Sequence, residues 1–144
     1  MPKLSKYCIF CFQLNIMAKA FFTNIQNLTE NEDYRLSKQF EKHIVVTDTC
    51  HIWQGRTDTY GYGEVRIQFR GARVCLKAHR VIFALSKKDI VLTESKDVSH
   101  LCHNRCCVKL EHLSYEPHSI NNQRLVCRNE GECFGHHGYS HCFI

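Results

Sequence analysis

The sequence lacks any apolar run long enough to cross a membrane, and it has neither internal repeats nor low-complexity segments. We therefore expect no membrane partner and no repeat architecture. The N-terminus is also a poor secretory signal, because Gln13, Asn15 and Lys19 interrupt its apolar stretch, although Ala18 to Ala20 mimics a cleavage site. The expected compartment is therefore intracellular.

Cysteine and histidine are both abundant, with 10 of each among 144 residues. A chain of this length is one domain by default and often needs covalent or metal cross-links beyond its modest core. The many histidines among the cysteines favour metal binding over disulfides, and a secreted disulfide-rich protein is the alternative. The net charge of +5 permits nucleic-acid binding, but an ordinary basic surface explains it equally well.

Residues 1–42 are interpreted as an N-terminal extension, and residues 43–144 as the functional domain. Cys8 and Cys11 form a lone CxxC, which is either half a zinc site or two unconnected thiols. Met17 is an alternative start. Thr29 followed by Glu32 resembles a capping box, which predicts a helix over about 30–42 with a packing role.

A β-hairpin is predicted within residues 60–77, with its turn at Gly71-Ala72. Apolar and polar residues alternate along both strands, so one face of this ribbon should be polar. A two-stranded ribbon fits the DNA major groove, where Arg and Gln read guanine and adenine. An ordinary solvated face is the alternative, and Cys75 on this face is unexplained. The candidate DNA-binding residues are Arg66, Gln68, Arg70, Arg73 and Lys77.

Residues 97–126 are predicted to form a strand at Asp97–Leu101, a Cys-rich loop, a strand at Leu113–Tyr115, and a helix from Pro117 to about Val126. Zinc prefers four nitrogen or sulfur ligands in a tetrahedron. Cys102, Cys107 and His112 supply three, and Cys50 is the isolated upstream cysteine best placed to supply the fourth. A buried thiol cluster without metal is the alternative.

Residues 127–142 are predicted to form a second zinc site, a knuckle in a Gly-rich tail that would have no core without metal. The predicted ligands are Cys127, Cys133, His137 and Cys142. His136 could replace His137, and the spacing does not decide between these adjacent histidines.

His100 and Asn121 are the candidate catalytic pair, because the predicted strand, loop, strand and helix would bring them together around the first zinc site. An imidazole can take a proton from water, so His100 is the candidate general base. The carbonyl oxygen of Asn121 can bind a hard cation such as Mg²⁺, which bridges to substrate phosphate. A histidine and an asparagine taken alone are more often structural, and only their spacing around the zinc ligands favours this interpretation.

The segment His100 to Asn121 resembles the active-site segment of the His-Cys box homing endonucleases. The resemblance extends to Cys127 and Cys133, and the wider chain is similar to HNH nucleases of the same ββα-metal superfamily, over about residues 48–142. The motifs that carry it are Ser99-His100-Leu101-Cys102-His103-Asn104, Cys107-Val108, Glu111-His112-Leu113, Asn121, Cys50-His51-Ile52-Trp53-Gln54-Gly55, Gly61-Tyr62-Gly63 and Ala78-His79-Arg80.

This resemblance implies a small α+β fold with a ββα-metal active site, two structural Zn²⁺ ions and a catalytic Mg²⁺. The implied function is hydrolysis of double-stranded DNA in the nucleus, with His100 as general base, Asn121 as metal ligand and Arg73 near the scissile phosphate. A homodimer is also implied, although the sequence ends at Ile144, before the longer tail of the family's dimers. A non-catalytic zinc-finger DNA-binding module is the competing hypothesis, and it has no need of His100 or Asn121.

Overall fold

The computed structural model describes residues 16–144, so the CxxC of Cys8 and Cys11 lies outside the described part. Residues 16–23 are helical, and none of the helices in the described part is long and apolar enough to cross a membrane. The elements that follow are the 3-10 helix η1 (Ile25–Asn27), α2 (Glu30–Glu41), β1 (Ile44–Val46), β2 (His51–Trp53), β3 (Glu64–Phe69), β4 (Ala72–Lys77), α3 (Ala78–Ser86), β5 (Lys96–His100), the 3-10 helix η2 (Leu110–His112), β6 (Leu113–Pro117) and α4 (His118–Glu130).

The capping box at the start of α2 is confirmed. The Thr29 side chain accepts a hydrogen bond from the Glu32 backbone N–H, and the Glu32 carboxylate accepts one from the Thr29 backbone N–H. The reciprocal bonds satisfy two backbone donors that would otherwise lack partners, which fixes where the helix begins. The helix buries Leu36 and Phe40 against the rest of the molecule.

The hairpin β3–β4 has the predicted alternation, with Val65, Ile67 and Phe69 buried on one face. Its turn is shifted by one residue from the prediction. Arg70 and Gly71 occupy the turn with φ of 47° and 83°, while Ala72 pairs with Phe69. Two successive positive φ values match the right-handed twist of the flanking strands, and glycine adopts the second at no steric cost.

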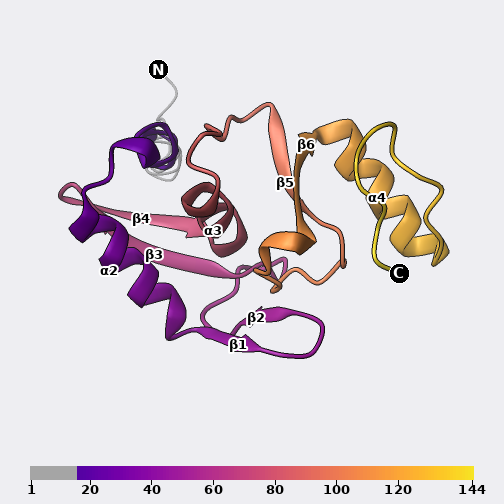
Figure 1. Ribbon diagram of the computed structural model, residues 1–144, viewed down its shortest axis with the longest axis horizontal. Coiled ribbons are helices and arrows are strands. Elements are labelled where there is room, and N and C mark those ends of the chain that lie inside the picture. Colours follow the sequence, from indigo (N-terminus) through magenta and orange to yellow (C-terminus); the bar gives the residue numbers. More distant parts are fainter. Residues whose placement is uncertain (1–15) are drawn as a thin grey trace, which may run out of the picture.

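Strands β5 and β6 pair in antiparallel register, from Lys96 opposite Pro117 to His100 opposite Leu113. Helices α3 and α4 flank this pair on opposite sides (Figure 1). Helix α4 begins at His118, one residue after the predicted start at Pro117, and it runs to Glu130 rather than to about Val126. Gly131 ends the helix in the left-handed conformation, so Cys127 lies in the last helical turn.

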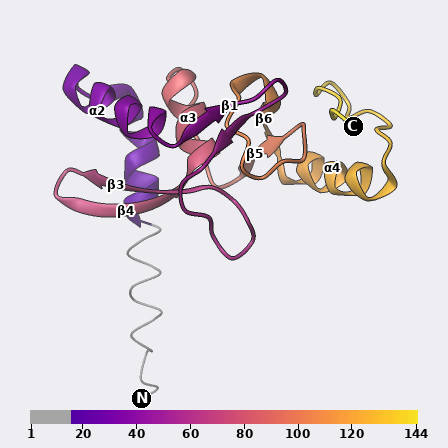
Figure 2. The same cartoon turned by 90° about the horizontal axis from the view of Figure 1, so that it is seen from below.

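The structure is thus a mixed α+β fold with three two-stranded antiparallel sheets in its described part. One hydrophobic cluster joins the N-terminal helical residues Phe21, Ile25 and Phe40 to the apolar face of β3–β4 and to α3. Figure 2 shows α2 and α3 on one side of the β3–β4 ribbon, with α4 and the C-terminal segment at the far end of the molecule. The apolar core therefore packs against one face of the ribbon. Most residues of the two predicted zinc sites come from the C-terminal half of the sequence.

Candidate metal centres and the pocket between β5 and α4

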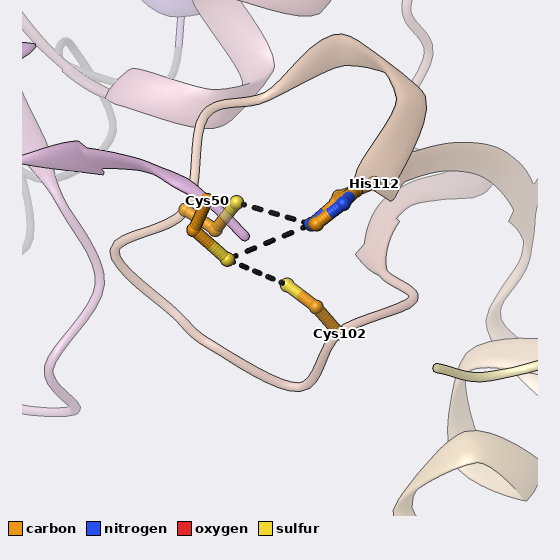
Figure 3. A group of neighbouring side chains, drawn as sticks. Cys50, Cys102 and His112 are labelled. Atoms are coloured by element: carbon orange, nitrogen blue, oxygen red, sulfur yellow. Dashed lines mark hydrogen bonds between the residues drawn. The ribbon is translucent and has the colours of Figure 1, made fainter. Parts of the chain in front are cut away.

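The first Cys/His cluster joins segments that are far apart in the sequence. Cys50 ends the loop between β1 and β2, Cys102 follows β5, and Cys107 pairs with Ile52 of β2 through an isolated bridge. His112 is the last residue of η2. Figure 3 shows Cys50, Cys102 and His112 pointing toward a common centre. The structure therefore brings together the four residues that the sequence predicted for the first zinc site.

The separations in this cluster fit a tetrahedral zinc ion. Zinc–sulfur bonds of about 2.3 Å and zinc–nitrogen bonds of about 2.0–2.1 Å place two sulfurs about 3.8 Å apart and a sulfur about 3.6 Å from a nitrogen. The Sγ atoms of Cys50 and Cys102 are 3.8 Å apart, and His112 Nδ1 lies 3.6 Å from Cys50 Sγ and 3.5 Å from Cys107 Sγ. A disulfide would need sulfurs about 2.05 Å apart. The donor set and its spacing therefore suit zinc.

The second cluster joins the end of α4 to the C-terminal segment. Its members are Cys127, Cys133, His136 and Cys142. His136 Nε2 lies 3.6 Å from Cys127 Sγ and 3.4 Å from the Sγ atoms of both Cys133 and Cys142. The Cys142 backbone N–H donates to Cys133 Sγ over 3.3 Å. These separations again match three thiolates and one imidazole around a tetrahedral zinc.

The prediction of His137 as the histidine of this site differs from the structure, which places His136 there. Residues 136–139 form a tight turn, in which the Tyr139 N–H donates to the His136 carbonyl. His137 and Gly138 are the central residues of the turn, with φ of 32° and 86°. The turn leaves His137 exposed and His136 buried among the cysteines. His136 Nδ1 lies 3.3 Å from Gln123 Oε1, an outer contact that can orient the ring.

His100 and Asn121 line one pocket of about 80 Å³ between β5 and α4, together with Tyr62 and Arg105. The Cys107 carbonyl can only accept, so His100 Nε2 donates to it over 3.0 Å, which leaves Nδ1 as the basic nitrogen. Burial lowers the pKa of His100 to about 4, against the opposing effect of this hydrogen bond, so the imidazole is neutral near pH 7. The structure therefore brings together the two residues predicted as general base and metal ligand.

Asn121 is held in place by a group that the sequence reasoning missed. Its Nδ2 donates to Asp97 Oδ2 over 2.9 Å. The same carboxylate oxygen accepts from His118 Nδ1 over 2.7 Å, and His118 Nε2 donates to the Glu94 carbonyl over 3.0 Å. No local motif marks Asp97, because its partners are 21 and 24 residues away.

A buried ion pair, also missed from the sequence, ties β6 to α4. Arg124 makes two hydrogen bonds to the Glu116 carboxylate, of 2.6 and 2.7 Å, and the side chains are 2% and 0% exposed. Arg124 also donates to the Ser140 carbonyl and to Cys142 Sγ, at 2.9 and 3.5 Å. The pair therefore fastens the second Cys/His cluster to the strands that carry His100.

The predicted ribbon residues are only partly assembled as expected. Arg66 and Gln68 of β3 are exposed on one face with Arg73 of β4, and Gln68 pairs directly with Arg73. Arg70 lies in the turn, and its guanidinium contacts Asn24 Oδ1 and the Asn27 carbonyl at 3.4 and 3.5 Å. It therefore turns toward the N-terminal helical residues, away from this face.

The remaining two predicted residues have other surroundings than expected. Lys77 forms an ion pair with Asp58. Arg73 is exposed on β4, two residues after the hairpin turn, and it does not line the pocket of His100 and Asn121 among the described residues. Arg105, Arg124 and Arg128 line that pocket instead. Arg73 therefore lies outside this pocket, and its predicted place beside a scissile phosphate stays a prediction.

Comparisons with known proteins agree with this geometry. The model of a family described as the zinc-binding loop region of homing endonuclease matches residues 49–142, which include every member of both Cys/His clusters. A curated relative, Protein 2.8 of Escherichia phage T7, is 34% identical over 102 residues, which are 71% of this chain and 64% of the relative. The chain thus spans less than two thirds of that relative's length. No solved structure matches.

Proposed function

This chain belongs to the family defined by the zinc-binding loop region of homing endonucleases, and from that premise we propose that it is a metal-dependent endonuclease of double-stranded DNA. The observation that carries the proposal is the pocket that His100 and Asn121 line together. A protein that only binds DNA needs neither a neutral buried imidazole nor an amide that lines the same pocket. The two Cys/His clusters support the loop and the helix that bring these side chains together.

In the proposed reaction, His100 accepts a proton from the water that attacks the scissile phosphorus, which is ordinary general-base chemistry. The Asn121 carbonyl oxygen is the proposed ligand of a Mg²⁺ ion, which when bound would stabilise negative charge on the leaving 3′ oxygen. Arg105 donates to the Tyr60 carbonyl and lies 5.2 Å from the Tyr62 ring, at the edge of the pocket. We propose that its guanidinium, rather than that of Arg73, neutralises the scissile phosphate.

The exposed face of β3–β4 is the proposed DNA-reading surface. Arg66, Gln68 and Arg73 are exposed there on adjacent strands, while the opposite face is fixed by the core. Arginine can pair with guanine and glutamine with adenine through the major groove. This face also favours the second candidate function, a zinc-stabilised DNA-binding module without catalysis.

The His100→Ala variant separates the two functions. The zinc-loaded protein is incubated with supercoiled plasmid and Mg²⁺, and a sample without any added divalent cation is the control. We expect wild type to cleave, and His100→Ala to cleave roughly two to four orders of magnitude more slowly, the usual contribution of a positioned general base. Zinc content and DNA affinity should be unchanged in the variant. Equal cleavage by both proteins, or none by wild type with any divalent cation, leaves the binding module as the better function.

A further inference from the structure

Asp97 lies where strand β5 faces helix α4. It stands directly opposite Glu116 of β6, so the two carboxylates share one face of the strand pair. On α4, Asn121 and Arg124 are three residues apart and therefore share one face of the helix. Asn121 donates to Asp97, and Arg124 donates to Glu116. Each carboxylate thus takes its own donor from α4, one helical turn apart.

We propose that Asp97 is a positioning residue that holds the Oδ1 atom of Asn121 toward a divalent cation in the pocket. An ionised carboxylate only accepts hydrogen bonds, so the amide of Asn121 must turn its Nδ2 to Asp97 and its Oδ1 away. The inference rests on the proposed function, which makes Asn121 the metal ligand. What the inference adds is that Asp97 determines which end of the Asn121 amide, Oδ1 or Nδ2, lies toward the cation.

The position of Asp97 is itself fixed. Its Oδ2 accepts from His118 Nδ1 as well as from Asn121, and the far side of the His118 ring is held by the Glu94 carbonyl. The negative charge on Asp97 also polarises the Asn121 amide, which makes Oδ1 a stronger ligand for a cation. Outer carboxylates of this kind usually contribute 10–100-fold to metal affinity or activity.

The test uses the full-length, zinc-loaded protein with a DNA duplex. Binding of Mn²⁺ is followed by its electron paramagnetic resonance signal, which does not depend on cleavage. Asp97→Ala should weaken Mn²⁺ binding by about 10–100-fold and raise the Mg²⁺ concentration for half-maximal cleavage by a similar factor. Saturating Mg²⁺ should restore most of the rate. Asp89→Ala, which removes an exposed carboxylate just after α3, is the matched control and should change neither value.

A double variant separates positioning from a merely structural role. If Asp97 acts through Asn121, then Asp97→Ala should have no further effect on Mn²⁺ affinity in an Asn121→Ala background. Asp97→Asn keeps an acceptor oxygen without the charge, so its affinity should lie between those of wild type and Asp97→Ala. Should Asp97→Ala lose zinc or unfold, this milder variant carries the test.

The outcomes distinguish this inference from the proposed function. Unchanged Mn²⁺ affinity in Asp97→Ala, additive losses in the double variant, or no Mn²⁺ binding by wild type overturns the role of Asp97. Wild-type Mn²⁺ binding that depends on Asp97 without any cleavage supports the role of Asp97 and overturns the nuclease.

Discussion

At the scale of single residues, the pKa of His118 depends on the charge of Asp97. The two ring nitrogens of His118 face groups that can only accept, the Asp97 carboxylate and the Glu94 carbonyl, so the doubly protonated ring satisfies both contacts. The hydrogen bond to Asp97 and the charge of that carboxylate raise the pKa of His118 above its ordinary value. The pKa of His118 therefore reports whether Asp97, the residue that positions Asn121, is in contact with the ring.

The titration of His118 by NMR tests this arrangement. In wild type we expect a pKa above the ordinary value of about 6.5, because the protonated ring is stabilised by Asp97. In Asp97→Ala the pKa should fall back toward that value, and in Asp89→Ala it should stay where it is in wild type. A wild-type pKa at or below the ordinary value would contradict the contact.

Some residues of the metal sites and of the pocket could be predicted from the sequence, and others could not. Cys102, Cys107 and His112 could be grouped because they are close in the chain and of the residue types that zinc prefers, and Cys50 was the isolated upstream cysteine best placed to join them. His136 and His137 could not be separated in that way, since the choice depends on the backbone of one tight turn. Asp97 carried no signal, because a carboxylate on a half-buried strand acquires its role only from the helix packed beside it.

At the scale of elements, the ends of helices and hairpins decide where side chains point. The sequence predicted the alternation of β3 and β4 correctly, but the turn is one residue earlier, so Arg70 lies in the turn and its side chain contacts Asn24 instead of joining the exposed face. The predicted end of α4 near Val126 is too early, because the helix continues to the left-handed cap at Gly131 and takes in Cys127. The apolar pattern determines which face of β3 and β4 is buried, while Gly71 and Gly131 determine where the hairpin turns and where α4 ends.

The ion pair between Glu116 and Arg124 gives an element-scale prediction. Arg124→Leu leaves a fully buried carboxylate without a partner, so the free energy of unfolding should fall by about 3–5 kcal/mol. Adding Glu116→Leu should recover the part of that loss that comes from the unpaired charge, while the contacts of Arg124 with Ser140 and Cys142 stay lost. Urea denaturation in excess zinc measures both. Arg128→Leu, at an exposed position on the same helix, should change the value by no more than about 0.5 kcal/mol.

At the scale of the whole molecule, the described chain has one apolar core and two Cys/His clusters that extend the fold beyond it. The hydrophobic cluster includes helix, ribbon and strand residues up to Leu113, whereas the C-terminal segment after α4 contributes no residue to it among those described. That segment is joined to the rest by Arg124, by the hydrogen bond from the Phe143 N–H to the Leu101 carbonyl, and by the second cluster. Its order should therefore depend on zinc.

The last prediction concerns this dependence. Wild type should contain two zinc ions per chain by elemental analysis, because each cluster offers a full tetrahedral donor set. His136→Ala and Cys133→Ala should each contain one, with the first site kept. His137→Ala is the matched control, and its exposed ring in the turn predicts two zinc ions.

Hydrogen exchange should locate the loss. In His136→Ala, amides after about residue 130 should lose protection, because the three remaining cysteines cannot complete the tetrahedron that holds the segment against α4. Amides of β5 and β6 should stay protected. The two strands pair with each other, and the first cluster next to them takes none of its ligands from the C-terminal segment. The reverse pattern, with His137→Ala losing one zinc and the tail while His136→Ala keeps both, would show that the turn at 136–139 presents the other imidazole to the metal.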